Sequence, residues 1–240
     1  MDNCLLVGAS GGIGHALLLR LLDDPEIGHI EATGRTGLPP AAQSAGAHWQ
    51  ALDLASDDSI QGNRLRWLES LDHLDYLVFA TGMLQDEQQR PEKRLAALDG
   101  NNAQRSLRVN CIGPLLLLAA LEPLLKKAAS PKVIFLSAQV GSIEDNELGG
   151  WYSYRMAKAA LNMGIKSAAI EFSRWRNDPV IMAVHPGTTH SSLSAPFTRN
   201  RKQRVRPATE TAGNIHHLMK SAHSAHHGGF FTAEGAPLPW

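Results

Sequence analysis

A tyrosine and a lysine, Tyr154 and Lys158, stand four residues apart in the stretch GGWYSYRMAK. If this stretch is helical, the two side chains share a face, with their Cβ atoms about 5–6 Å apart. A free phenol has a pKa of about 10, and a nearby ammonium lowers it because the positive charge favours the phenolate. Such a pair could exchange a proton with a substrate oxygen, although this spacing also occurs by chance on solvated helices.

A glycine-rich turn near the N-terminus offers a place for a phosphate-bearing cofactor. The segment VGASGGIG lies between a short apolar run and an amphipathic one, hence between a predicted strand and a predicted helix. Its glycines permit a tight turn, close approach to a pyrophosphate and close helix–strand packing, and the helix start presents unpaired N–H groups. The alternative is a turn without a ligand. The residues of this turn expected to contact a cofactor are Gly8, Ser10, Gly12, Ile13 and Gly14.

The elements that must position these groups alternate between strand and helix along the chain. The predicted strands are 4–7, 30–33, 48–52, 76–80, 132–137, 180–186 and 229–232. The predicted helices are 15–24, 60–71, 103–127, 152–176 and 207–220. Pro114 and Pro123 predict kinks or breaks in the third helix. This alternation, without a linker or a repeat, favours a single-domain α/β fold over residues 1–240: a Rossmann-type, doubly wound parallel sheet flanked by helices.

The composition of the chain excludes few classes of protein, but it is that of an ordinary globular protein. The 240 residues are 43% hydrophobic and 19% charged, an ordinary globular mix. Lys plus Arg and Asp plus Glu both number 23, which favours neither nucleic acid nor an anionic membrane as a partner. Cys4 and Cys111 lie in apolar surroundings and suit a reducing compartment. The N-terminus lacks the pattern of a signal peptide, and the longest apolar run, 115–121, is too short to span a bilayer. We therefore expect a cytoplasmic protein.

Two clusters suggest other functions. The segment 199–206, RNRKQRVR, is basic but lacks interleaved aromatic residues, so we expect a mobile, solvated segment near the substrate mouth rather than a nucleic-acid site. Five histidines between positions 216 and 227 have no acidic or cysteine partner at ligand spacing. We expect no metal site there.

The turn spacing Gly-x-x-x-Gly-x-Gly, followed by Tyr-x-x-x-Lys, resembles the short-chain dehydrogenase/reductase family. The segments GSIEDNELGGWYSYRMAKAALNM, VHPGTTHSSLSAPF and GGFFTAEGAPLPW are most similar to its C-factor-like branch, and the likeness spans essentially the whole chain. The resemblance implies a cytoplasmic, NADP-dependent carbonyl reductase or alcohol dehydrogenase acting on a small-molecule substrate. It also implies a homodimer or homotetramer, and it leaves the substrate open.

The nucleotide preference rests on the end of the second predicted strand. A carboxylate there would bind the ribose 2′-hydroxyl of NAD, whereas an arginine nearby accepts the 2′-phosphate of NADP. This chain has Gly34 in the acid's place, followed by Arg35. The sequence therefore predicts NADP(H), the alternative being that Arg35 is a solvated surface residue.

By the same resemblance, other cofactor contacts follow later strands. The pair after the third strand matches the family's adenine contact, the segment after the fourth offers backbone contacts, and the Pro-Gly segment lies beside the nicotinamide carboxamide, where glycine would let the cofactor approach. These expected contacts are Asp53, Leu54, Ala80, Thr81, Gly82, Pro186, Gly187 and Thr188.

The catalytic set that the resemblance implies is Tyr154 as acid/base, Lys158 as its tuner and ribose ligand, and Asn110 as support for a water relay. All three are also expected to contact the cofactor. Asn110 could equally satisfy a helix irregularity before a proline. The family's second serine after the fifth strand is replaced here by Ala138, and we expect Ser137 to substitute, with Ser142 as the alternative. A missing serine keeps a second hypothesis open, an NADP-binding regulatory or signalling protein with a degenerate active site.

Overall fold

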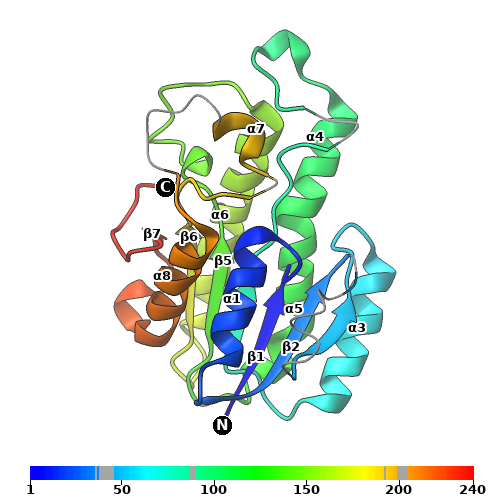
Figure 1. Cartoon of the computed structure of the whole chain (residues 1–240), viewed down its shortest axis with the longest axis vertical. Coiled ribbons are helices and arrows are strands. Elements are labelled where there is room, and N and C mark those ends of the chain that lie inside the picture. Colours follow the sequence, from blue (N-terminus) through cyan, green and yellow to red (C-terminus); the bar gives the residue numbers. More distant parts are fainter. Residues whose placement is uncertain (36, 38–45, 87–89, 192, 199–204) are drawn as a thin grey trace.

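The computed structural model of the chain describes residues 1–35, 37, 46–86, 90–191, 193–198 and 205–240. Seven strands form one parallel sheet in the order β3-β2-β1-β4-β5-β6-β7 (Figure 1). The strands are β1 Asp2–Val7, β2 Ile27–Gly34, β3 His48–Ala51, β4 Tyr76–Phe79, β5 Lys132–Leu136, β6 Val180–His185 and β7 Phe230–Thr232.

This strand order confirms the Rossmann-type prediction. The chain proceeds outward from β1 to β3, then returns to pair β4 with the other side of β1. The direction of winding thus reverses between β1 and β4, and ligands of such sheets bind beyond the carboxyl ends of the strands at that point. All seven predicted strands exist. Four end one residue earlier than predicted, at Ala51, Phe79, Leu136 and His185. The residues that follow the last three, Ala80, Ser137 and Pro186, lie in loops that line this crevice.

Helices cover both faces of the sheet (Figure 1). The α-helices are α1 Gly12–Leu22, α3 Asp57–Ser70, α4 Gly100–Leu107, α5 Gly113–Leu125, α6 Tyr152–Phe172, α7 Ala195–Thr198 and α8 Ala208–Ser221. Three short 3₁₀ turns are η1 Leu95–Ala97, η3 Gln139–Gly141 and η4 Ser224–His226.

The two faces of the sheet form separate cores because strand side chains alternate. Leu5 of β1 packs on the face covered by α3, α5 and α6, whereas Leu6 packs on the face covered by α1 and α8. Each helix contributes an apolar stripe to its own core, such as Leu17 and Leu21 from α1. These two cores fix the helices, and therefore the loops that surround the crevice.

The long predicted helix is present but irregular before Pro114, as predicted, whereas Pro123 lies inside α5 and does not interrupt it. It runs as α4, a π-helical segment η2 (Arg108–Ile112) and α5. Pro114 has no N–H group, so the carbonyl of Asn110 lacks the donor that a regular α-helix would supply. By length and composition Gly100–Leu125 could cross a membrane, but half of its most apolar window is buried, against α3 and α6.

Candidate active site

A cavity of about 550 Å³ opens at the carboxyl ends of β4, β5 and β6, where the fold predicts a ligand. Many residues predicted for the site meet in its wall. Those that line the cavity are Ile13, Ala80, Thr81, Gly82, Ser137, Tyr154, Lys158, Pro186, Gly187 and Thr188. Other predicted residues lie outside its wall: Gly8, Ser10, Gly12, Gly14, Arg35, Asp53, Leu54 and Asn110.

The glycine-rich turn is shaped by close backbone contacts. Gly8 has φ +92°, a conformation that suits glycine, and its N–H donates to the carbonyl of Thr33 at 3.0 Å. A Cβ atom on Gly14 would lie 2.1 Å from the Gly8 carbonyl oxygen, so only glycine fits there. Gly11 is the N-cap of α1 and has no side chain to occupy the first N–H groups. The turn therefore has the form that holds a pyrophosphate at a helix N-terminus.

The end of β2 leaves no room for an acidic side chain. A Cβ atom on Gly34 would lie 2.5 Å from Ser10 Oγ and 2.7 Å from the ring of Trp49. Arg35, the next residue, is exposed at the same edge of the sheet. The position that would carry an NAD-type carboxylate is thus closed by packing, and a guanidinium stands beside it.

Lys158 is buried next to Asn110 at one edge of the cavity. It is 2% exposed, and its Nζ donates to the Leu136 carbonyl at 2.9 Å. A Cβ atom on Gly82 would lie 3.8 Å from Asn110 Oδ1 and 3.9 Å from Lys158 Nζ, so both groups converge on this glycine. Burial lowers the pKa of Lys158 to about 8. Lys158 can therefore still carry a proton at neutral pH.

Tyr154 lies beside this lysine, but the pKa of its phenol differs from the expectation. Its ring centroid is 5.9 Å from Lys158 Nζ, and Trp151 packs edge-on at 6.4 Å between centroids. The side chain is 7% exposed, and burial raises the pKa of Tyr154 above its ordinary value. The predicted lowering is thus wrong for this state of the protein, because desolvation outweighs the ammonium. The phenol is held protonated.

The carboxamide of Asn110 is occupied by structure. Its Oδ1 accepts from the Met83 N–H at 2.8 Å, while its Nδ2 donates to the Met83 carbonyl at 2.8 Å and to the Ser106 carbonyl at 3.0 Å. The side chain therefore fastens the loop after β4 to the π-helical segment. What remains for chemistry is the main-chain carbonyl, which Pro114 cannot engage.

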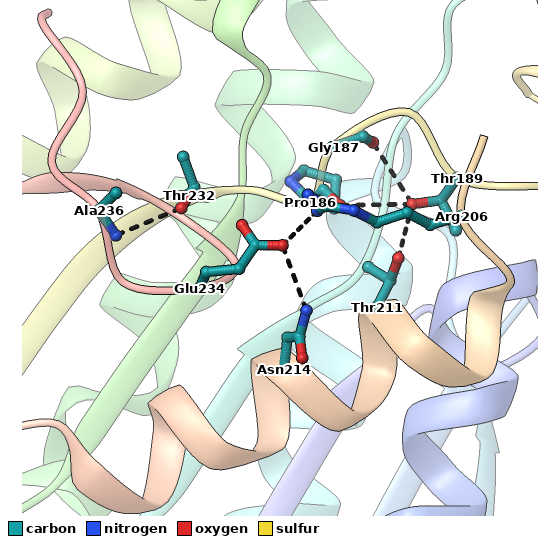
Figure 2. Close-up of polar contacts among 9 residues, drawn as sticks. All are labelled: Pro186, Gly187, Thr189, Arg206, Thr211, Asn214, Thr232, Glu234 and Ala236. Carbon is teal, nitrogen blue, oxygen red and sulfur yellow. Dashed lines mark hydrogen bonds and ion pairs between the residues drawn. The ribbon is translucent and has the colours of Figure 1, made fainter. Parts of the chain in front are cut away.

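Figure 2 shows Arg206 beside the Pro-Gly segment after β6, where it pairs with Glu234, while Thr189 Oγ1 donates to the carbonyls of Pro186 and Gly187. Gly187 has φ +74°, and a Cβ atom there would lie 2.7 Å from Arg206 Nη1. Arg206 lines the cavity and forms an ion pair with Glu234, while Thr189 Oγ1 bonds Thr211 Oγ1 at 2.9 Å. In this structure Gly187 makes room for the guanidinium, not only for a cofactor as predicted.

The glycine turn and the buried Tyr154–Lys158 pair both lie within a segment that matches a known protein family. Residues 2–202 match the family model described as short chain dehydrogenase. The chain belongs to the short-chain dehydrogenase family.

Several of the similar proteins are named as dehydrogenases or reductases. The chain is 29% identical to 1-hydroxy-2-glutathionyl-2-methyl-3-butene dehydrogenase of Rhodococcus sp. (strain AD45), over all of both chains. It is 29% identical to C-signal of Myxococcus xanthus, over 61% of this chain and 83% of that one, in line with the C-factor-like branch predicted. The NADPH-bound carbonyl reductase from chicken fatty liver is similar in structure, with a TM-score of 0.86 and 26% identity over 100% of this chain and 98% of the other.

The serine position is where this short-chain dehydrogenase departs from its family's pattern. Ala138 stands in the serine's place, and β5 ends before Ser137, whose hydroxyl donates to Asn162 Oδ1 at 2.6 Å in a buried contact. Ser142 Oγ donates to the Trp240 carbonyl at 3.1 Å. Both hydroxyls donate within the protein, and of the two only Ser137 lines the cavity, so its role as the substitute stays a prediction.

The remaining adenine-side residues have local roles in this short-chain dehydrogenase. Asp53 is exposed, and its Oδ1 accepts from the Ala55 N–H at 2.9 Å, which forms the turn before α3. Leu54 is buried under Gly113, where a Cβ atom would lie 2.2 Å from the Leu54 carbonyl oxygen. Thr81 packs against Gly8 and so closes the base of the glycine turn.

The histidines have structural partners. His216 Nε2 lies 2.9 Å from Asp24 Oδ2, His227 Nε2 lies 2.7 Å from the Ala169 carbonyl, and the rings of His223 and His226 meet edge to face. In the described part of the chain, no group of three or more His, Cys, Asp or Glu side chains is arranged to hold a metal ion. His185 Nδ1 accepts from the Gln139 N–H at 3.2 Å, which braces the loop after β5.

Sequence reasoning missed two charged residues near the catalytic pair. Arg206 was expected to be solvated with its basic neighbours; instead it is half-buried in the cavity wall, while residues 199–204 of that cluster lie outside the described part of the chain. Glu92 lies in the polar stretch RPEKR, yet it is buried and contacts the start of α6. Nothing in their local sequence distinguishes either residue from a solvated charge.

Proposed function

We propose that the protein is an NADP(H)-dependent oxidoreductase that interconverts a carbonyl and an alcohol by hydride transfer. The observation that carries this proposal is the meeting of Tyr154 and Lys158 in one cavity at the switch point of the sheet. NADPH, when bound, supplies the hydride that goes to the carbonyl carbon. The protein supplies the proton and the positioning.

Tyr154 donates the proton to the carbonyl oxygen. Its phenol is protonated at neutral pH and can act as the acid in the reductive direction, although burial raises its pKa and so weakens it as an acid. The ammonium of Lys158 then stabilises the phenolate that forms. A water held by the Asn110 main-chain carbonyl would return a proton to this pair.

The residues fit NADP better than NAD. The glycine turn would hold the pyrophosphate, Arg35 would pair with the 2′-phosphate through charge-assisted hydrogen bonds, and Gly34 excludes an opposing carboxylate. The structural neighbour with NADPH bound supports the same preference.

The substrate is proposed to be bulky and apolar near its carbonyl group. The outer wall of the cavity is formed by the large apolar side chains of Leu84, Val140, Leu148, Trp151 and Leu193. Leu148 is 92% exposed, so its apolar surface is available at the mouth. Such walls bind apolar substrates through burial of apolar area.

We further propose that the protein self-associates as a dimer or tetramer. Large apolar side chains are exposed on α5 and α6, at Leu116, Met163 and Ile170. Exposed apolar clusters of this kind mark association surfaces. Light scattering at micromolar concentration tests this, and a monomer mass would contradict it.

One observation favours a second candidate, an NADP-binding signalling protein with little turnover. Ala138 removes a donor to the reacting oxygen, and the two nearby serine hydroxyls are bonded elsewhere. Loss of one preorganised donor costs on the order of 10²–10³ in rate. The relative named C-signal is consistent with this candidate.

NADPH oxidation against a panel of aliphatic and aromatic aldehydes, ketones and quinones separates the two. The oxidoreductase predicts saturable turnover on bulky apolar carbonyls, with NADH used less well. Tight NADPH binding by calorimetry without turnover on any carbonyl would favour the signalling candidate. A preference for NADH would contradict the cofactor proposal.

A further inference from the structure

The helix that carries Tyr154 and Lys158 begins without a cap of its own. The residue before α6 is Trp151, whose side chain makes no capping hydrogen bond and whose backbone is left-handed at φ 53°. Non-glycine residues avoid this conformation unless surrounding contacts impose it. Three residues later stands Tyr154, so an error at this start would displace the phenol.

Glu92 supplies the missing contacts from 61 positions earlier in the chain. Its carboxylate accepts from the Ser153 N–H at 3.2 Å through Oε2 and from the Ser153 hydroxyl through Oε1. Its main-chain carbonyl accepts from the Trp151 N–H at 2.5 Å. Both partners are well buried, with Glu92 6% exposed and Ser153 fully buried. A carboxylate at a helix N-terminus also meets the positive end of the helix dipole.

The contact joins two walls of the cavity. Glu92 belongs to the connection between β4 and α4, in which Thr81, Gly82 and Leu84 line the cavity. Trp151, which Glu92 holds through its main chain, lines the opposite wall and packs edge-on against the ring of Tyr154. Glu92 therefore ties the start of α6 to the connection that carries these lining residues.

We infer that Glu92 is a positioning residue: its buried carboxylate caps α6 in place of a local cap and thereby sets the orientation of Trp151 and Tyr154 in the cavity. The inference rests on the proposed function for its kinetic consequence, but the contact itself can be tested without turnover. Glu92→Gln keeps the size of the side chain and removes its charge. The new NH₂ group is a hydrogen-bond donor, so it cannot accept from Ser153 as the carboxylate oxygen that it replaces does.

The kinetic test compares Glu92→Gln with Glu122→Gln, a matched change in an exposed ion pair to Lys126 on α5. Misplacement of a catalytic group by a fraction of an ångström lowers kcat by about tenfold to a hundredfold, so we expect that loss in Glu92→Gln with the KM for NADPH unchanged. Glu122→Gln should match wild type. Ser153→Ala, which keeps the N–H contact, should lie between, and Glu92→Gln/Ser153→Ala should lose no more than Glu92→Gln alone.

The second test is hydrogen exchange of the NADP-bound protein, which needs no substrate. The amides of 151–155 should exchange about tenfold faster in Glu92→Gln, and not in Glu122→Gln, because their local opening becomes easier. If the exchange and kcat of Glu92→Gln equal those of wild type while only the melting temperature falls, Glu92 is merely structural and the inference is overturned. If wild type turns over no carbonyl, the proposed function fails, and the exchange result still decides whether Glu92 holds this segment.

Discussion

The nucleotide end and the catalytic end of this site are built in different ways. At the nucleotide end, the groups that shape the turn come from one contiguous stretch, Gly8 to Gly14, and are fixed by backbone contacts that only glycine allows. At the catalytic end, Lys158 bonds the Leu136 carbonyl, and Ser153 bonds Glu92, across 22 and 61 positions of sequence. The turn at the nucleotide end is one local segment that also bonds Thr33 of β2, whereas the catalytic end is assembled from distant segments.

This difference determines how each end can fail. A substitution at the glycine turn collides with backbone, since a Cβ atom on Gly14 would lie 2.1 Å from Gly8 O. At the catalytic end, the buried polar groups depend on partners that one substitution can remove, and an unpaired buried donor or acceptor costs about 1–3 kcal/mol. Catalysis should therefore be more sensitive than cofactor binding to changes far from the cavity.

The largest effect is expected from Tyr154→Phe. Removing the phenolic proton donor should lower kcat by about 10²–10⁴-fold, the usual contribution of a general acid. NADPH affinity should be unchanged, because the nucleotide end is built separately. Steady-state kinetics and calorimetry measure both, and Tyr152→Phe, one position into the same helix, is the matched control. Equal activity in Tyr154→Phe and wild type would remove Tyr154 from the mechanism.

The buried amine of Lys158 should make stability depend on pH. Its pKa is about 8 in the folded protein against 10.5 ordinarily, so between these values the unfolded chain binds more protons. Burying the charge costs stability below pH 8, and this cost is relieved as pH rises to 10.5. The stability of wild type relative to Lys158→Met should rise by up to about 3 kcal/mol between pH 7 and 10.5.

Denaturant unfolding at several pH values measures this difference. Lys127→Met, at an exposed lysine, is the control and should show no such rise. If the difference in unfolding free energy between wild type and Lys158→Met did not change with pH, burial would not be lowering the pKa of this amine.

A serine placed at position 138 tests whether the missing hydrogen-bond donor limits the rate of the reaction. Ala138→Ser should raise kcat by about tenfold to a hundredfold, less than a fully preorganised donor contributes. Ser137→Ala should instead leave kcat near wild type and lower stability by about 1–3 kcal/mol, because Asn162 Oδ1 loses its buried donor. If Ser137→Ala lost activity and Ala138→Ser gained none, Ser137 would be the polarising serine after all.

The sequence was sufficient for features that depend on local spacing. Strand alternation predicted the parallel sheet, Pro114 predicted the irregular helix, and the glycine turn was placed correctly between β1 and α1. Prediction from the sequence failed for properties that depend on burial or on partners distant in the chain. The acidity of Tyr154 depends on desolvation, the bond of Ser137 to Asn162 depends on where β5 ends, and Arg206 is paired with Glu234 from the C-terminal segment.

Cofactor preference should respond to one exposed residue at the nucleotide end. Arg35→Ala should weaken NADPH binding by about tenfold to a hundredfold, the value of charge-assisted hydrogen bonds to a phosphate, and leave NADH affinity unchanged. Binding titrations with both nucleotides measure this, with the exposed Arg174→Ala as control. A parallel loss for both nucleotides would place Arg35 elsewhere than at the 2′-phosphate.

The smallest effect concerns Arg206, where the two ends of the site meet. Its guanidinium lines the cavity and is neutralised by the partly exposed Glu234, so the pair contributes at most about 1 kcal/mol. In Glu234→Gln the positive charge in the cavity is uncompensated, and NADPH should bind about two- to fivefold more tightly at low salt but not at high salt. Weaker binding at every salt concentration would instead mean that Glu234 holds Arg206, and through it Gly187, in place. Cofactor binding would then depend on partners distant in the sequence, as the catalytic end does.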